Sequence, residues 1–331
     1  AMFFGFFDKK AMFNIKHKQG VLNMNNYKKI GLTALAGSLV AGSVSAAEMS
    51  ASGSATLTYT GGDEKATHGN GWVMGDSVTF SASGDVNDFT VTYSVELDRG
   101  VGVDDNSLTF DFGDAGVLSF AGHGGSSFLS ANDDVMPTAS EEPWDVITGA
   151  DTGRVNGFDG DGSWKYVYAH ESGLNLTVGY LNADDANSDV SYTDIGVTYT
   201  GVDGLSVSYA SQDGTDASTD AQVLKASYAY GPVTVAYSDY SYDTTGTTSD
   251  DDTTSFKVSY TVSDELSVTY GSETVERPGK TEDGEYRSIS ASYTAGGMTI
   301  TGAMQDADNM DGTTTATQDR ERWALSASFA F

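Results

Sequence analysis

Alternation of apolar and polar residues continues through almost all of residues 47–331, and it restricts the fold more than any other feature of the chain. In residues 174–180, LNLTVGY, apolar side chains occupy every second position. The same pattern recurs in residues 205–209, 233–237 and 266–270. Because successive side chains of a β-strand point to opposite faces, this period of two predicts strands. Val, Thr, Tyr and Phe dominate these runs, as pleated sheets favour, and no helical period competes with them.

Short turns and long polar loops separate the predicted strands in strict alternation. We expect seven short turns, at residues 85–88, 113–116, 171–173, 201–204, 231–232, 263–265 and 295–297. We expect eight long loops, at residues 61–71, 98–106, 122–162, 182–189, 211–220, 241–252, 272–284 and 305–320. Together they join sixteen strands. All four Pro residues lie in these connections, as expected because Pro cannot donate a hydrogen bond to a sheet ladder.

Strands of this kind suit a membrane barrel and exclude a bundle of membrane helices. The mean hydropathy is −0.29, and only the N-terminal region approaches the ~20 apolar residues of a transmembrane helix. Alternating strands of 8–11 residues can cross a bilayer when tilted, although they average to a polar hydropathy. Short turns at one end and long loops at the other are typical of outer-membrane barrels. We therefore predict an all-β fold, a transmembrane antiparallel β-barrel of sixteen strands, closed because an open edge would leave unpaired backbone groups in hydrocarbon.

The polar face of each predicted strand would point into the barrel. In residues 89–96, Thr, Thr, Ser and Glu alternate with Phe, Val, Tyr and Val. With the apolar face toward lipid, the inward face of each strand carries Ser, Thr, Asn, Asp or Lys. A barrel of sixteen strands is too wide for side chains to fill, so the pattern predicts an aqueous channel.

Tyrosines recur at the ends of the predicted strands. One set lies near the long loops and comprises Tyr59, Tyr93, Tyr180, Tyr209, Tyr237 and Tyr270; the other lies near the short turns and comprises Tyr199, Tyr230, Tyr260 and Tyr293. A side chain with an apolar body and a polar tip suits the head-group zone, so two such rings predict the two membrane interfaces. The alternative is aromatic packing between strands of a soluble sheet, which gives no reason to mark both ends.

The N-terminus has the three parts of a secretion signal. In residues 24–46, two lysines precede an apolar run at 30–40, and small residues follow. This order predicts a signal peptide that is cut before Ala47. Residues 1–23 do not continue either pattern, and we interpret them as an upstream segment outside the mature protein. The barrel domain would then comprise residues 47–331.

Composition and motifs exclude several classes of function. The chain has 17 Lys and Arg against 47 Asp and Glu, a net charge of −30, which argues against nucleic-acid binding because that needs a basic face. The absence of Cys excludes disulfides and thiolate metal sites. His123 begins a glycine run, but no nucleophile elbow, phosphate loop or zinc motif accompanies it. We therefore expect no enzyme activity and no obligatory cofactor.

One short motif has the spacing of a calcium loop. Asp159 and Asp161, in the sequence DGDGS, place carboxylates two residues apart. The motif lacks the Gly and the distal Glu of an EF-hand, so a bound Ca²⁺ and a solvated turn remain alternatives.

The chain ends in the alternating sequence WALSASFAF, whose last residue is aromatic. Here the sequence resembles the porins of Gram-negative outer membranes, which end in such a strand with a terminal Phe. The resemblance covers residues 47–331, in pattern more than in identity, and is nearest to the sixteen-stranded general porins of the alphaproteobacterial kind. It implies that the barrel-assembly machinery recognises this strand through Trp323, Leu325, Phe329 and Phe331.

The resemblance also implies a location, partners and a function. Such porins are passive diffusion channels for ions and small hydrophilic solutes in the outer membrane, where they contact lipid and lipopolysaccharide. They are homotrimers whose long third loop folds into the pore as its constriction. Loop 122–162 is the longest here, but Met136–Trp144 stands where the enterobacterial signature Pro-Glu-Phe-Gly-Gly-Asp would be. Small residues with outward parity, which suit subunit contacts, are Ala51, Gly53, Ala55 and Ala327.

Charges in the expected pore suggest its selectivity. The acidic residues predicted to form the constriction in the third loop are Asp133, Asp134, Glu141, Glu142, Asp145 and Asp151. The basic residues predicted to form the opposite pore wall are Arg99, Lys165, Lys225, Lys257 and Arg322. The overall excess of acid favours cations, because rings of carboxylates select them. The alternative is that these charges only solvate polar loops.

Other functions remain open at this level. A surface adhesin or structural barrel would bind partners through its long loops and leave the pore unused. A secreted soluble β-sandwich, or an outer-membrane hydrolase that depends on His123, would share parts of the pattern. The polar inward faces favour the channel over the adhesin. A sandwich would be distinguished by not needing detergent, and a hydrolase by loss of activity in His123→Ala.

Overall fold

The computed structural model describes most of the predicted barrel domain. The described residues are 48–63, 71–98, 102–132, 158, 160–183, 190–215, 219–244, 250–310, 312 and 319–331. The predicted upstream segment, 1–23, and the predicted signal peptide, 24–46, lie outside them. Among the described residues there is no helix long and apolar enough to cross a bilayer.

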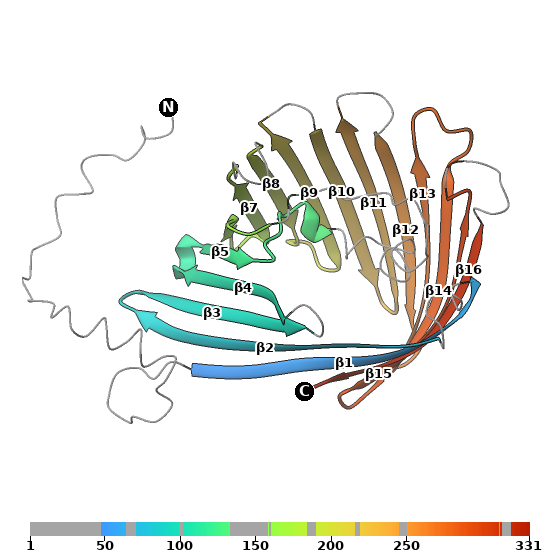
Figure 1. The fold of residues 1–331 in the computed structure, drawn as a ribbon, viewed down its shortest axis with the longest axis horizontal. Helices are drawn as coiled ribbons and strands as arrows, with labels where there is room; N and C mark the ends of the chain where they lie inside the picture. The colour runs from blue at the N-terminus through green and yellow to red at the C-terminus, as the bar shows by residue number, and fades with distance from the viewer. Residues whose placement is uncertain are drawn as a thin grey trace, which may run out of the picture. The chain divides into compact units, whose positions relative to one another are not determined.

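Sixteen strands form one closed antiparallel barrel, in which each strand pairs with its neighbours in the chain and β1 pairs with β16 (Figure 1). The strands are β1 (Glu48–Gly62), β2 (Trp72–Val86), β3 (Phe89–Asp98), β4 (Gly102–Asp111), β5 (Val117–His123), β6 (Trp164–Ala169), β7 (Leu174–Leu181), β8 (Tyr192–Tyr199), β9 (Leu205–Gly214), β10 (Thr219–Tyr230), β11 (Val233–Thr244), β12 (Asp251–Thr261), β13 (Leu266–Glu276), β14 (Gly284–Ala295), β15 (Met298–Asp308) and β16 (Arg320–Ala330). Within the described ranges, two short 3₁₀ helices, η3 (Gly113–Ala115) and η4 (Ser130–Asn132), lie in connections. The predicted fold class, strand number and short turns are confirmed.

The barrel closes where the first strand meets the last. Leu57 faces Ala327 across this pair of strands, and Gly53 and Phe331 exchange backbone hydrogen bonds of 2.8 and 3.0 Å. Glycines on β1 make room for aromatic rings of β16. A Cβ on Gly53 would lie 2.7 Å from the ring of Phe331, and one on Gly61 would overlap the indole of Trp323.

The apolar face points outward around the barrel. Met304 is 66% exposed and Leu325 52%, whereas their inward neighbours Gln305 and Ser326 are buried and half-buried. This is the reverse of a soluble sheet, and it fits a wall that contacts hydrocarbon.

Several strands are longer than the alternation predicts. We expected loops from residues 211, 241 and 272, but β9, β11 and β13 continue to Gly214, Thr244 and Glu276. Likewise β4, β10, β12, β14 and β15 extend into the expected loops 98–106, 211–220, 241–252, 272–284 and 305–320. In the extensions of β9–β15 the outward residues are polar, so the apolar half of the pattern ends while the hydrogen-bonded ladder continues. The extension of β4 differs, because its outward residue Val103 is apolar and faces Leu97 of β3.

Of the tyrosines predicted near the long loops, Tyr209, Tyr237 and Tyr270 therefore lie within their strands, whereas Tyr180 lies at the end of β7 as predicted. Each of three hydroxyls donates to a polar side chain: Tyr180 to Asn182 at 2.9 Å, Tyr209 to Gln222 at 3.1 Å and Tyr237 to Asp239 at 3.2 Å. On β9–β15 these tyrosines thus mark the boundary between an apolar band and a polar outer wall nearer the long loops, whereas Leu97 continues the apolar face beyond Tyr93 on β3.

The glycine at position 61 offers a test of barrel closure. We expect Gly61→Val to displace the Trp323 indole and to lower the free energy of unfolding by about 1–3 kcal/mol, as overpacking does. The measurement is urea unfolding of the protein in lipid vesicles. Gly302→Val is the matched control, because a Cβ on this outward glycine of β15 meets no atom within 4 Å. Equal losses in the two variants would contradict the account.

Candidate functional site

Pairs of hydroxyls line the inner wall of the barrel. Each pair joins adjacent strands through a side-chain hydrogen bond of 2.8–3.2 Å, and the pairs are Thr56–Ser328, Ser81–Ser94, Thr109–Ser119, Thr198–Ser208, Ser259–Thr269 and Ser292–Thr301. Every member has inward parity, since its strand neighbours point to lipid. A hydroxyl that donates to its partner keeps acceptor capacity for water. This wall therefore suits an aqueous lumen.

The third loop begins and ends against the inner wall. Asp194, an inward residue of β8 with no exposed surface, accepts the N–H of Phe128 at 2.5 Å and that of Leu129 at 3.2 Å. At the other end of the loop, the N–H of Phe158 donates to the side-chain oxygen of Gln212 on β9 at 2.6 Å. Two polar side chains of the wall thus hold both roots of the loop inside the barrel.

Apolar packing strengthens the first of these anchors. Leu129 is fully buried in a cluster of inward side chains, Ala210, Ala221, Val223 and Tyr240, from β9, β10 and β11. A second cluster, at the loop end of β13–β15, contains Val275, Tyr286, Ala307 and Met310. The prediction that every inward face is polar is wrong at these places. Inward apolar residues occur there because segments of the loops cover them.

Two inward glycines make the docking possible. A Cβ on Gly196 of β8 would overlap the ring of Phe128, and a Cβ on Gly179 of β7 would lie 3.0 Å from the ring of Phe158. Gly179 also leaves space for the Asp194 carboxylate. These residues, together with Asp194 and Gln212, were missed from the sequence. The available signal was a pair of inward glycines on neighbouring strands.

The four described bases of the predicted pore wall lie on the inner face. Lys165, Lys225, Lys257 and Arg322 belong to β6, β10, β12 and β16, and all are half-buried. Arg322 donates to Gln305. Arg287 of β14 has outward parity, and its guanidinium forms ion pairs with Glu285 at 2.6 Å, Asp308 at 3.3 Å and Asp306 at 3.4 Å. The structure places the bases, and their effect on selectivity stays a prediction.

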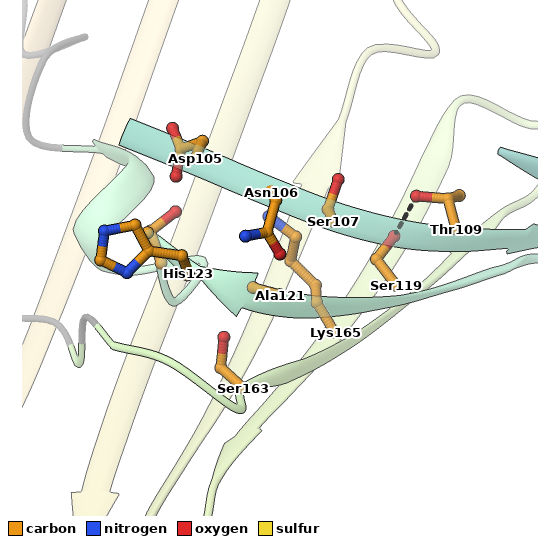
Figure 2. A pocket seen from close by; sticks show the side chains of 12 residues that line it. Asp105, Asn106, Ser107, Thr109, Ser119, Ala121, His123, Ser163 and Lys165 are labelled. Carbon is orange, nitrogen blue, oxygen red and sulfur yellow. Dashed lines mark hydrogen bonds between the residues drawn. The ribbon is translucent and has the colours of Figure 1, made fainter. Parts of the chain in front are cut away.

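A recess of about 260 Å³ opens in the wall formed by β4, β5 and β6 beside the root of the third loop. Figure 2 shows Asp105, Asn106 and Lys165 around it, with His123 at the loop side. The hydroxyls of Thr109 and Ser119 lie in the same wall and share a hydrogen bond of 3.2 Å.

Comparison with known proteins gives the family. The family model described as Gram-negative porin matches residues 31–283. The chain belongs to the Gram-negative porin family. Together with the closed barrel, this makes it an outer-membrane porin. No curated protein sequence matches it.

Solved structures share the fold of this porin at low sequence identity. OmpT of Vibrio cholerae has 16% identity and a TM-score of 0.67, over 87% of this chain and 99% of that one. The anion-selective porin of Comamonas acidovorans has 13% identity and a TM-score of 0.65, over 86% of this chain and 100% of that one. A mutant of the Rh. blastica porin has 15% identity and a TM-score of 0.63, over 86% and 100%.

Some predicted site residues of the porin fall outside the described part. These are Arg99, the constriction residues Asp133, Asp134, Glu141, Glu142, Asp145 and Asp151, and the candidate calcium ligand Asp159. The other candidate ligand, Asp161, lies 2.7 Å from Nδ1 of His123. Within the described ranges, no group of three or more His, Asp or Glu residues could hold a metal ion. The calcium site stays a prediction.

The carboxylate of Asp194 offers a test of loop anchoring. In Asp194→Ala the N–H groups of Phe128 and Leu129 lose their acceptor, which costs about 1–3 kcal/mol when such groups are buried. We expect a less firmly held third loop, measured as stronger current noise in single open channels. Asp213→Ala, an exposed residue of β9, is the control and should leave the noise unchanged. Equal noise in wild type and Asp194→Ala would refute the anchoring role.

Proposed function

We propose that this porin is a passive diffusion channel for ions and small hydrophilic solutes, with a preference for cations. The observation that carries the proposal is the wall of paired hydroxyls around a closed barrel of sixteen strands. The hydroxyls of such a wall can form hydrogen bonds with water and dissolved solutes along the pore. They do not select one solute over another. The third loop, anchored at both roots, would form the constriction in the lumen.

The charge at the loop end of the barrel supports the cation preference. Between the tyrosines near the long loops and the loops themselves, the outer wall of the barrel carries six carboxylates: Asp213, Asp220, Asp239, Asp243, Asp252 and Glu276. These carboxylates are part of the excess of acid that gives the chain its net charge of −30. A mouth with an excess of one sign raises the local concentration of the opposite ions, so cations would enter more readily. The inward lysines would moderate this preference.

The reversal potential of single channels tests the proposal. In a planar bilayer with a KCl gradient, we expect stable conductance steps and a reversal potential on the cation side. Replacing both Lys225 and Lys257 by Met should increase the cation preference, because it removes two positive charges from the inner wall. Arg287→Met, on the outer wall, should change it less. An anion-side potential would refute the preference, whereas insertion without conductance would refute the channel and favour the adhesin.

We further propose a homotrimer that contacts through the closure region. Small outward residues, Ala51, Gly53 and Ala55, occupy alternate positions on β1, and Ala327 of β16 faces Leu57, two residues beyond Ala55. Among the related structures, one form of Vibrio cholerae OmpT is described as a trimer. The ring of Phe331 occupies the space above Gly53, so the contact surface would combine small residues with an aromatic edge.

Native mass spectrometry tests the trimer. In mild detergent we expect three copies for the wild type and loss of the trimer in Ala55→Trp, because a bulky side chain would separate the subunits. Ala226→Trp, an outward change on β10 at the opposite side of the barrel, should keep three copies. A wild-type monomer would contradict the proposal.

Export and assembly complete the proposed function. Residues 24–46 would direct secretion and be removed before Ala47, with residues 1–23 absent from the mature protein. Trp323, Leu325, Phe329 and Phe331 would present the C-terminal strand to the barrel-assembly machinery; the side chains of all four are exposed. The acidic outer wall would face lipopolysaccharide.

A further inference from the structure

The recess beside the root of the third loop has a positive side chain at its end away from the long loops. Lys165 of β6 stands opposite Ser119 of β5 and Gly179 of β7, and its side chain runs along the recess (Figure 2). Asp194 lies beyond Gly179 and attracts this ammonium, but its carboxylate is held by loop N–H groups. Within the described residues, Lys165 forms no ion pair. Its charge is therefore available to a solute.

The end of the recess toward the long loops is negative. Asp105 of β4 stands opposite Glu96 of β3 and next to Asp104 in the chain. The register of β4 shifts at Glu96/Leu97 and again at Asn106/Ser107, and these irregularities set the direction of Asp105. Gly124 closes over it with a φ of +67°, and a Cβ there would overlap the Asp105 carboxylate. Because Gly124 has no side chain, the root of the third loop can lie directly against the Asp105 carboxylate at the edge of the recess.

Small polar side chains line the recess between Lys165 and Asp105. Ser107, Thr109, Ser119 and Ser163 supply hydroxyls, and Asn106 supplies an amide. A volume of about 260 Å³ corresponds to about nine water molecules at ~30 Å³ each, so it holds a small solute but not a large one. The lining contains no Phe, Tyr or Trp, which argues against recognition of a sugar ring by stacking on a large aromatic face.

We propose that this recess is a binding subsite for small zwitterionic amino acids on the permeation path. The proposal rests on the proposed channel function and specifies one class of solute for it. The carboxylate of the amino acid would pair with Lys165 and its ammonium with Asp105, while the hydroxyls bind the remaining polar atoms. An anion would be repelled by Asp105, Asp104 and Glu96, a cation would be repelled by Lys165, and a neutral polyol would gain only hydroxyl contacts.

Interruption of single-channel current by L-serine tests the subsite. Protein extracted from the membranes of a porin-deficient host is placed in a bilayer, and serine, lactate, ethanolamine and glycerol are added in turn. We expect interruptions that rise and saturate with serine and stay rare with the other three solutes. Lys165→Met and Asp105→Asn should each weaken the serine effect about tenfold or more, since each removes a charge-assisted hydrogen bond.

Two further variants separate the subsite from general pore charge. Lys165→Arg keeps the charge and should retain most of the serine effect. Lys225→Met removes an inward lysine of β10 outside the recess and should shift ion selectivity without changing the serine effect. Heat-dependent gel mobility reports whether each variant is folded. A serine effect no greater than that of glycerol, or one that survives in folded Lys165→Met, would overturn the proposal.

Failure of the channel can be distinguished from failure of the subsite. If the wild type shows no conductance in KCl, the channel proposal fails, and serine is titrated against the protein in detergent by calorimetry. Saturable binding that Lys165→Met weakens about tenfold would sustain the subsite. No saturable binding of serine would overturn it.

Discussion

The pairing of β1 with β16 is the constraint on which the rest of the structure depends. An unpaired backbone N–H or C=O costs several kcal/mol in hydrocarbon, so a sheet with an open edge cannot remain in a bilayer. Here the ladder runs from Ser54–Ala330 to Gly62–Arg322 and is extended by the hydrogen bonds between Gly53 and Phe331. The glycines of β1 and the aromatic rings of β16 form one joint, because each ring occupies the space that a side chain on β1 would need.

Closure divides every strand into a lipid face and a lumen face, and the lumen face carries the function. Most of the lumen face is lined by hydroxyls that form hydrogen bonds between adjacent strands. These hydroxyls keep the wall hydrated without making it selective for one solute. One exception is the apolar cluster of β13–β15, and another is the wall of β7–β11, where Asp194, Gln212 and Leu129 join the third loop to the barrel. There, wall side chains replace water as hydrogen-bond partners of the loop backbone. The inner wall thus combines a surface of paired hydroxyls with two sites at which it holds the roots of the third loop.

The bilayer explains which sequence predictions were correct. Lipid on one side and water on the other impose a period of two, so strand number, short turns and the inward parity of Lys165 and Lys225 follow from counting. The same reasoning placed the strand ends too early on the side of the tyrosines that faces the long loops. There both faces are wet, so the apolar positions disappear while the hydrogen bonds of β9, β11 and β13 continue. It also failed at Val223 and Tyr240, because an inward residue covered by a loop no longer faces water.

The sequence by itself determined the class of fold, the direction of each strand and the side on which each wall residue lies, because these depend only on local alternation and on the connections between strands. Only the tertiary structure decided which distant residues meet. Asp194 reaches Phe128, and Asp105, His123 and Lys165 surround one recess, although they come from separate strands. These contacts depend on strand register, on the irregularities of β4 and on glycines against which a loop can pack. None of these features produces a periodic pattern in the sequence.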